Sequence, residues 1–121
     1  MRQLFQVLVV ALSTGLMLGP TAMPAHSSDA TLPASELLLA CTTPDESWIS
    51  FCNGYMQAAF DYAVLEGLAC AREGLTRTDL TVLFEREAAL ALVRNRNSLE
   101  AVDGFVLAVS IFSENLACNQ P

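Results

Sequence analysis

The chain has 121 residues and a formal net charge of -7 at pH 7, with 13 acidic residues and six basic ones, all arginine. Nucleic-acid binding needs clustered positive charge that displaces counterions from phosphates, so this composition excludes that class of function. The acidic balance instead fits a soluble protein or one that binds a basic protein partner.

The N-terminal segment 1–30 has the layout of a secretory signal peptide. Arg2 precedes an apolar run over 4–18, which is interrupted by polar and small residues and makes a poor membrane span. Small residues between Ala25 and Ala30 suit cleavage by signal peptidase. Since this segment contains no cysteine, we do not expect a lipid anchor. We therefore predict an exported domain over 31–121, with an uncleaved N-terminal anchor as the alternative.

The first two predicted helices follow the leader. The first covers 35–41, between Pro33 and Pro44, and the second covers about 45–67 and ends at Gly67, a residue suited to a helix C-terminus. Apolar residues of the second helix recur at steps of three and four and share one face: Trp48, Phe51, Tyr55, Ala58, Tyr62 and Leu65. We interpret this face as core, with a binding platform as the alternative.

The third predicted helix begins after Gly74, where Thr76 and Asp79 form a start that resembles a capping box. Its exit loop is the polar segment 94–97. Its apolar side carries Leu80, Leu83, Phe84, Leu90 and Val93.

The fourth predicted helix starts at Ser98, a good N-cap, and runs to about Leu116. Its apolar stripe suits either a core or a homodimer and consists of Leu99, Val102, Phe105, Val106, Val109, Phe112 and Leu116. No alternating pattern predicts a strand, so the fold class is all-α, a small bundle of about four helices.

Four polar or small residues lie inside the predicted helices. Asp61 and Asp103 fit the polar back face of an amphipathic helix, or a carboxylate at a partner interface. Gly54 and Gly104 each cost about 1 kcal/mol relative to alanine in mid-helix, and close helix approach is the usual reason for such a glycine.

The four cysteines, Cys41, Cys52, Cys70 and Cys118, lack the close spacing of a zinc site, and disulfides are the usual form in an exported protein. Short loops make consecutive helices antiparallel neighbours. Cys41 can then reach the early turns of the second helix, and Cys118 returns to the end where that helix stops. We predict the disulfides Cys41–Cys52 and Cys70–Cys118.

Residues that would support catalysis are scarce. The single histidine, His26, lies at the predicted cleavage boundary, which excludes histidine-assisted nucleophiles and histidine metal sites from the exported domain. A pair of carboxylates of the kind that glycosidases use would be Asp61 with Glu66, or Glu85 with Glu87. Glu85 and Glu87 point about 200° apart on a helix, so they cannot flank one bond. We expect no enzyme activity, no catalytic residues, no metal and no cofactor.

Four short blocks stand in one order along 34–118: Leu37-Leu38-x-x-Cys41, Phe51-Cys52-x-Gly54-Tyr55, Cys70-x-x-x-Gly74-x-Thr76 and Ala117-Cys118. Taken together, they resemble the Tai-like family of immunity proteins, which protect bacteria from amidase effectors of type VI secretion. The resemblance implies a periplasmic, disulfide-bonded helical protein, often dimeric, that binds a papain-like peptidoglycan amidase and occludes its cleft.

An inhibitor of this kind needs a rigid scaffold that presents a loop, because pre-organisation reduces the entropy lost on binding. Our hypothesis for the partner-binding loop is the segment after the third helix, Arg94, Asn95, Arg96 and Asn97; an ordinary solvated turn is its alternative. The alternative function is a periplasmic structural or chaperone-like helical protein without a dedicated toxin.

Overall fold

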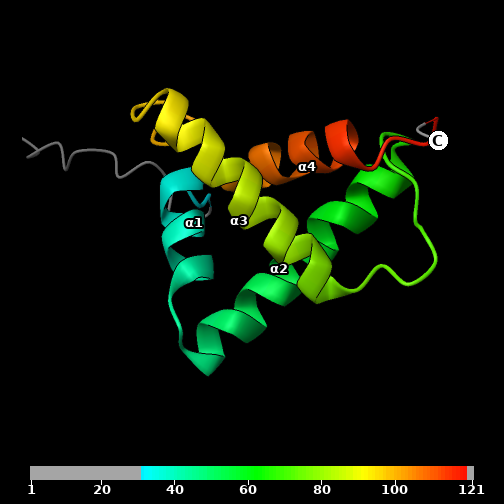
Figure 1. Ribbon diagram of the computed structural model, residues 1–121, viewed down its shortest axis with the longest axis horizontal. Coiled ribbons are helices and arrows are strands. Elements are labelled where there is room, and N and C mark those ends of the chain that lie inside the picture. Colours follow the sequence, from blue (N-terminus) through cyan, green and yellow to red (C-terminus); the bar gives the residue numbers. More distant parts are fainter. Residues whose placement is uncertain (1–30, 120–121) are drawn as a thin grey trace, which may run out of the picture.

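The computed structural model describes residues 31–119, so the predicted leader over 1–30 lies outside the described residues. The helices are α1 (Ala34–Thr42), α2 (Glu46–Leu65), α3 (Arg77–Arg94) and α4 (Gly104–Asn115) (Figure 1). Across 31–119 no β-strand is present, and the all-α prediction is confirmed.

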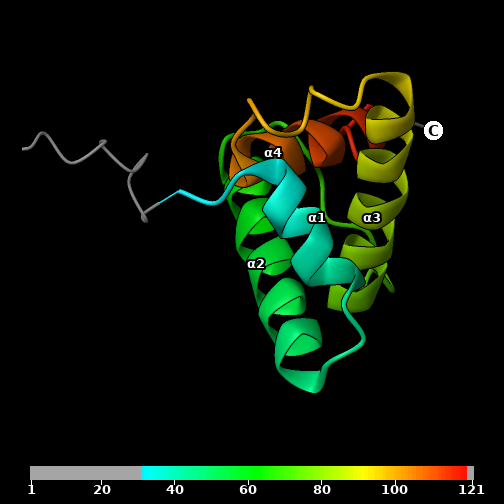
Figure 2. The ribbon, with the colours of Figure 1, turned by 90° about the vertical axis from the view of Figure 1, so that its left-hand side faces the viewer.

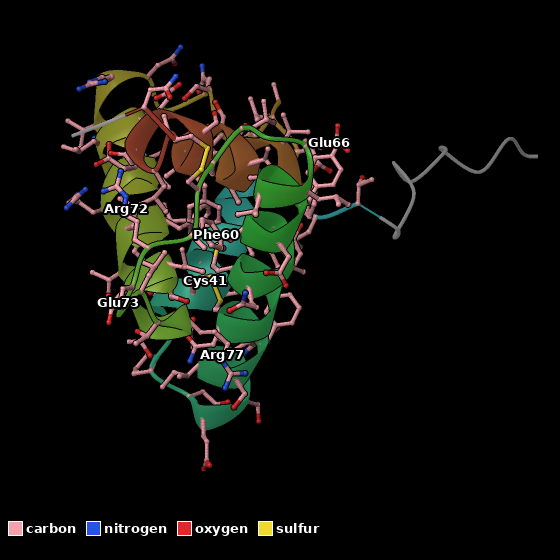
Figure 3. All side chains as sticks on the ribbon, turned by 90° about the vertical axis from the view of Figure 1, so that its right-hand side faces the viewer. Cys41, Phe60, Glu66, Arg72, Glu73 and Arg77 are labelled. Atoms are coloured by element: carbon pink, nitrogen blue, oxygen red, sulfur yellow. A yellow bond between two sulfur atoms is a disulfide. The ribbon has the colours of Figure 1, made fainter. Side chains whose placement is uncertain are left out.

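The four helices form one bundle in which every pair of helices is in contact. Seen from the side, α1 lies across the space between α2 and α3, and α4 crosses at one end (Figure 2). Each helix supplies at least one large, fully buried side chain, among them Leu37, Met56, Phe84 and Phe112. Burying such a side chain stabilises the fold by about 1.5–3 kcal/mol, so these residues define the core. Phe60 points from α2 into the same interior (Figure 3) and meets the Phe112 ring edge to face at 5.8 Å.

The first three helices begin and end close to where the sequence predicts. Asp45 caps α2 by accepting a 2.9 Å hydrogen bond from the Ser47 N–H. The α3 capping box is confirmed, because the Asp79 N–H donates to the Thr76 hydroxyl at 3.2 Å and the Thr76 N–H donates to the Asp79 carboxylate at 2.8 Å. Gly67 follows α2 with φ of +70°, the left-handed conformation expected of a glycine after a helix end.

The predicted start of the fourth helix at Ser98 is wrong. The helix begins at Gly104, and residues 98–102 form turns and bends instead. The reason is tertiary: the carbonyls of Leu99 and Val102 accept hydrogen bonds from the Ser35 and Ala34 N–H groups, at 3.1 and 2.8 Å. A helix over this segment would have used those carbonyls internally.

The roles predicted for Asp103, Gly104 and Gly54 also change. Asp103 is the α4 N-cap and accepts from the N–H groups of Phe105 and Val106, at 2.9 and 3.2 Å, rather than lying on a helix back face. Gly104 is the first residue of α4 and does lie at a close helix approach. Gly54 does not, because a Cβ added there would have nothing within 4 Å.

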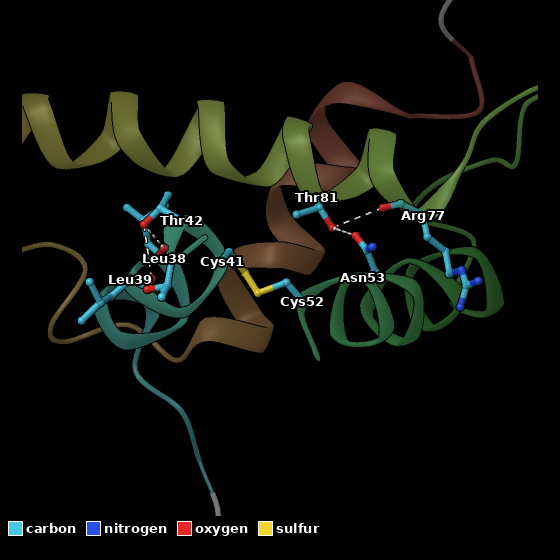
Figure 4. The surroundings of a disulfide bond; sticks show 9 residues. Leu38, Leu39, Cys41, Thr42, Cys52, Asn53, Arg77 and Thr81 are labelled. Carbon is cyan, nitrogen blue, oxygen red and sulfur yellow. Dashed lines mark hydrogen bonds between the residues drawn. A yellow bond between two sulfur atoms is a disulfide. The ribbon is translucent and has the colours of Figure 1, made fainter. Parts of the chain in front are cut away.

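Both predicted disulfides are confirmed. Cys41–Cys52 joins the end of α1 to the second turn of α2 with a Cα–Cα distance of 5.4 Å (Figure 4). Cys70–Cys118 joins the segment after α2 to the C-terminal end, with a Cα–Cα distance of 4.7 Å. The Cys70 N–H also donates a 2.8 Å hydrogen bond to the Leu116 carbonyl. Covalent links are therefore placed near both ends of α2, at Cys52 in its second turn and at Cys70 in the segment after it.

Candidate functional site

Two apolar faces lie side by side along α2, and the structure buries the one with smaller residues. The core-facing set is Cys52, Met56, Ala59, Phe60 and Ala63. The aromatic face that the sequence assigns to the core is largely outside it: Trp48 is 45% exposed, Phe51 40% and Tyr62 44%. The prediction of a core role for this face is therefore wrong. Small side chains on the other face let α2 approach its neighbours closely, which leaves the large rings at the flank.

The exposed rings of Trp48, Phe51 and Tyr62 form one continuous cluster with two half-buried rings, those of Tyr55 and Phe105. Ring centroids lie 5.7 Å apart for Trp48 and Phe51, and 5.6 Å apart for Phe51 and Tyr55. Phe105 of α4 continues the cluster, at 6.2 Å from Tyr55 and 5.5 Å from Tyr62. All of these pairs except the tilted Phe51–Tyr55 pair are edge-to-face, and such pairs stabilise a structure beyond the area they bury. These five residues are called the aromatic surface below.

A hollow of about 720 Å³ lies beside the aromatic surface, between α1 and α2. This α1–α2 groove is lined by Leu32, Glu36, Leu39, Ala40, Thr43, Trp48 and Phe51. Trp48 and Phe51 belong to both features, so the groove and the aromatic surface are continuous. Leu39 on the α1 side is 68% exposed, and the groove thus offers apolar atoms to solvent from both helices. Its mostly apolar lining suits an inserted apolar side chain.

The charges beside this region are acidic. Glu36 lines the groove, and Asp103 is close enough to Tyr55 for its charge to act on the phenol. Burial first, and then the Asp103 charge, raise the pKa of Tyr55 above its ordinary value of 10.0. Tyr55 therefore keeps its hydroxyl proton, and with it the ability to donate a hydrogen bond, at all physiological pH values.

The arginines lie elsewhere. All five arginines among residues 31–119 fall between positions 72 and 96, on the α2–α3 connection, on α3 and just after it. Helix α3 packs on the flank of α2 that carries Asn53, whose side-chain oxygen accepts a 2.8 Å hydrogen bond from the Thr81 hydroxyl (Figure 4). Asn53 is nearly opposite Phe51 on the helix, two residues away. The basic side of the molecule is thus separated from the aromatic surface.

The predicted partner-binding loop is an ordered turn at the end of α3. Arg94, Asn95, Arg96 and Asn97 are all exposed, as predicted for an exit loop. The Asn95 side chain accepts from the Asn97 N–H at 3.1 Å, and the Ser98 hydroxyl donates to the Asn95 carbonyl at 2.7 Å. Arg96 also lines a second hollow of about 410 Å³ with Leu92 and Val93. Neither the α1–α2 groove nor the aromatic contacts include a residue of this loop.

The remaining acidic candidates and the apolar stripe of the fourth predicted helix lie away from the groove lining. Asp61 accepts a 2.7 Å hydrogen bond from the Gln57 amide. Glu87 pairs with Arg86 at 2.9 Å, whereas burial raises the pKa of Glu85 above its ordinary value of 4.5. In α4 and the turn before it, Leu99, Phe112 and Leu116 are buried in the core and Val106 is exposed. The stripe predicted for a core or a homodimer therefore belongs mostly to the core.

Between residues 31 and 119, no group of three histidine, cysteine, aspartate or glutamate side chains is placed to hold a metal ion. No helix in that range is both long enough and apolar enough to cross a bilayer. Comparisons with protein families, with characterised proteins and with solved structures find no match to this chain.

Proposed function

We propose that this protein is a periplasmic immunity protein that binds and occludes a papain-like peptidoglycan amidase delivered by type VI secretion. The observation that best supports a binding role is the aromatic surface beside an apolar groove. Tyrosine, tryptophan and phenylalanine are enriched at protein interfaces, and tryptophan and tyrosine often supply much of the binding energy. The choice of an amidase as partner rests on the sequence blocks that resemble the Tai-like family.

The scaffold suits inhibition because its binding helix is restrained. Cys52 ties the early part of α2 to α1, and Cys70 ties the segment after α2 to the C-terminal end. A helix fixed near both ends loses little conformational entropy when a partner binds. Aromatic side chains add to this advantage, since each has only two rotatable side-chain angles to fix.

Two separate surfaces would act together in this proposal. The aromatic surface anchors the amidase, and the loop from Arg94 to Asn97 enters or covers the catalytic cleft. The loop is suited to that role because its backbone is already fixed by the Asn95 hydrogen bonds, while its side chains remain exposed. Guanidinium and amide groups there can hydrogen-bond to the carbonyls and carboxylates of a cleft that normally holds a peptide.

The proposed location follows from chemistry that the chain carries. Two disulfides form and persist in oxidising compartments such as the periplasm. The segment 1–30 supplies the layout of an export signal. Export would place the protein in the compartment where peptidoglycan amidases act.

The exposed apolar side chains also favour a second candidate, a chaperone-like protein without a dedicated toxin. Leu39, Trp48 and Phe51 present apolar surface that unfolded clients bind without strict sequence preference. This candidate predicts weak binding to many unfolded proteins, strongest near pH 3, where carboxylates are protonated. The immunity proposal predicts saturable binding to one enzyme at neutral pH.

The test is affinity capture from periplasmic extract of the source organism, using the protein expressed with its own leader and a C-terminal tag. Mass spectrometry identifies the retained proteins, and the captured enzyme is then assayed on peptidoglycan. A stoichiometric papain-like amidase that the bait inhibits is the expected result. A broad mixture of unrelated clients supports the chaperone-like candidate, and an amidase captured without loss of activity contradicts occlusion.

A further inference from the structure

We propose that the α1–α2 groove and the adjoining aromatic surface bind a protein segment in which apolar side chains are flanked by arginine or lysine. This goes beyond the proposed function, because it assigns the chemistry of the bound segment whichever protein carries it. The groove would take the apolar side chain, and acidic residues around it would pair with the basic neighbours.

The apolar half of the assignment follows from the groove lining. Five of its seven lining residues are apolar, and the two others are Glu36 and Thr43. Leu39 and Trp48 face solvent from opposite helices, 68% and 45% exposed. Covering such groups removes apolar area from water, which favours binding by about 25 cal/mol per Å². A polar insert would gain nothing from these walls and would lose its own hydration.

The charged half follows from what surrounds the groove. Glu36 lies in its wall and forms no ion pair with any residue of 31–119. Asp45 and Glu46 lie at the N-terminal end of α2, three and two residues before Trp48. Asp103, whose carboxylate caps α4, is close enough to Tyr55 of the aromatic surface for its charge to act on the phenol. No arginine lines the groove. A basic segment would meet complementary charge in the groove wall and beside the aromatic surface, which speeds association and fixes its register.

Charge also decides against the simplest other occupant, a second copy of the chain. A two-fold contact places the same patch on both subunits, so acidic Glu36 would meet a groove lining that has the same acidic residue and no arginine. Like charges brought together in an interface cost several kcal/mol. An anionic lipid surface meets the same objection, because the whole chain carries a net charge of -7.

The chain contains its own reporter for a test, since Trp48 is the only tryptophan and lies in the groove wall. The probe is a capped hexapeptide of two leucines flanked by two arginines on each side. One matched peptide replaces the arginines with glutamates, and another replaces the leucines with serines. We expect a saturable change of Trp48 fluorescence with the first peptide and at least about tenfold weaker binding of the other two, equivalent to about 1.4 kcal/mol.

Variants locate the binding. Glu36→Gln and Glu73→Gln remove the same charge, but Glu73 lies on the α2–α3 connection (Figure 3). Leu39→Ser and Leu65→Ser change two exposed leucines, of which only Leu39 lines the groove. We expect Glu36→Gln and Leu39→Ser to weaken peptide binding at least about fivefold, about 1 kcal/mol, while the two controls stay within about twofold.

Several results would overturn the assignment. Equal binding of the arginine–serine peptide would show mere attraction between opposite net charges, and equal weakening by Glu73→Gln would show the same. No fluorescence change up to about 1 mM peptide would exclude useful affinity. A dimer in solution that Leu39→Ser dissociates would assign the groove to a second copy. Amidase inhibition that survives Leu39→Ser and Glu36→Gln would leave the immunity proposal standing without this surface.

Discussion

The backbone N–H of Gly104 donates a 2.7 Å hydrogen bond to the carbonyl of Leu32, which joins the first residue of α4 to the segment that leads into α1. A Cβ on Gly104 would lie 2.8 Å from that same carbonyl oxygen and 2.8 Å from Cδ2 of Leu37. Neither atom can move freely, because one is backbone and the other belongs to a fully buried core residue. Glycine is therefore required for α4 to approach α1 this closely.

Gly104→Ala should lower the free energy of unfolding by about 1–3 kcal/mol, because the added methyl overpacks this contact. Gly54→Ala is the matched control, since it adds the same methyl inside α2 with nothing within 4 Å. It should raise the free energy of unfolding by about 0.5–1 kcal/mol, because alanine is the better helix former. Urea unfolding measures both, and a change of the same sign in the two variants would contradict the packing described here.

The two disulfides should differ in their contribution to stability. The loop closed by Cys70–Cys118 has a sequence separation of 48, and that closed by Cys41–Cys52 has one of 11. The chain-entropy relation gives about 4 kcal/mol for the long loop and about 3 kcal/mol for the short one. Unfolding of the Cys70→Ser/Cys118→Ser and Cys41→Ser/Cys52→Ser variants tests this. If the Cys41→Ser/Cys52→Ser variant lost more unfolding free energy than the Cys70→Ser/Cys118→Ser variant, native packing and not loop length would decide which disulfide contributes more.

The α3 capping box should make stability depend on acid. The hydroxyl and N–H of Thr76 both donate to the Asp79 carboxylate, which lowers the pKa of Asp79 below its ordinary value of 3.8. A lowered folded-state pKa gives stability that is present above the unfolded value and lost as pH falls through the folded one. The stability gap between wild type and Asp79→Asn should therefore shrink as pH falls below about 3.8. An NMR titration that places the Asp79 pKa at or above 3.8 would contradict the capping account.

The loop after α3 should matter for inhibition but not for folding. Arg94→Ala/Arg96→Ala changes two exposed side chains and should alter stability by less than about 0.5 kcal/mol per site. It should weaken inhibition of the amidase at least about tenfold, or about 1.4 kcal/mol. Arg86→Ala is the control, because Arg86 is an exposed arginine of α3 that pairs with Glu87. Unchanged inhibition by the loop variant would remove this segment from the binding account.

Much of the fold could be predicted from local sequence. Helix ends at Asp45, Thr76 and Gly67 follow from side chains or backbone freedom that act within a few residues. The disulfide pairing follows from antiparallel neighbours once the helices are placed. The start of α4 could not be predicted from local sequence. Residues 98–102 are held by hydrogen bonds from Ala34 and Ser35, which are distant in the chain.

The candidate site was harder to predict, for a reason that lies in α2. Periodicity finds both apolar faces of the helix but cannot say which one is buried. Cys52 contained the missing signal: its bond to Cys41 directs it inward, and Met56, Ala59 and Ala63 share its face. Phe51 precedes Cys52 by one residue and Tyr55 precedes Met56 by one residue. Each ring is therefore about 100° around the helix from the buried face.

The most direct test of the central claim is a titration of the papain-like amidase from the same organism with the oxidised, exported protein. Release of soluble peptidoglycan fragments is measured as the protein is added. The proposal predicts that activity falls to background at one equivalent, and that the Cys70→Ser/Cys118→Ser variant inhibits less. Full amidase activity in the presence of excess oxidised protein would contradict the immunity function.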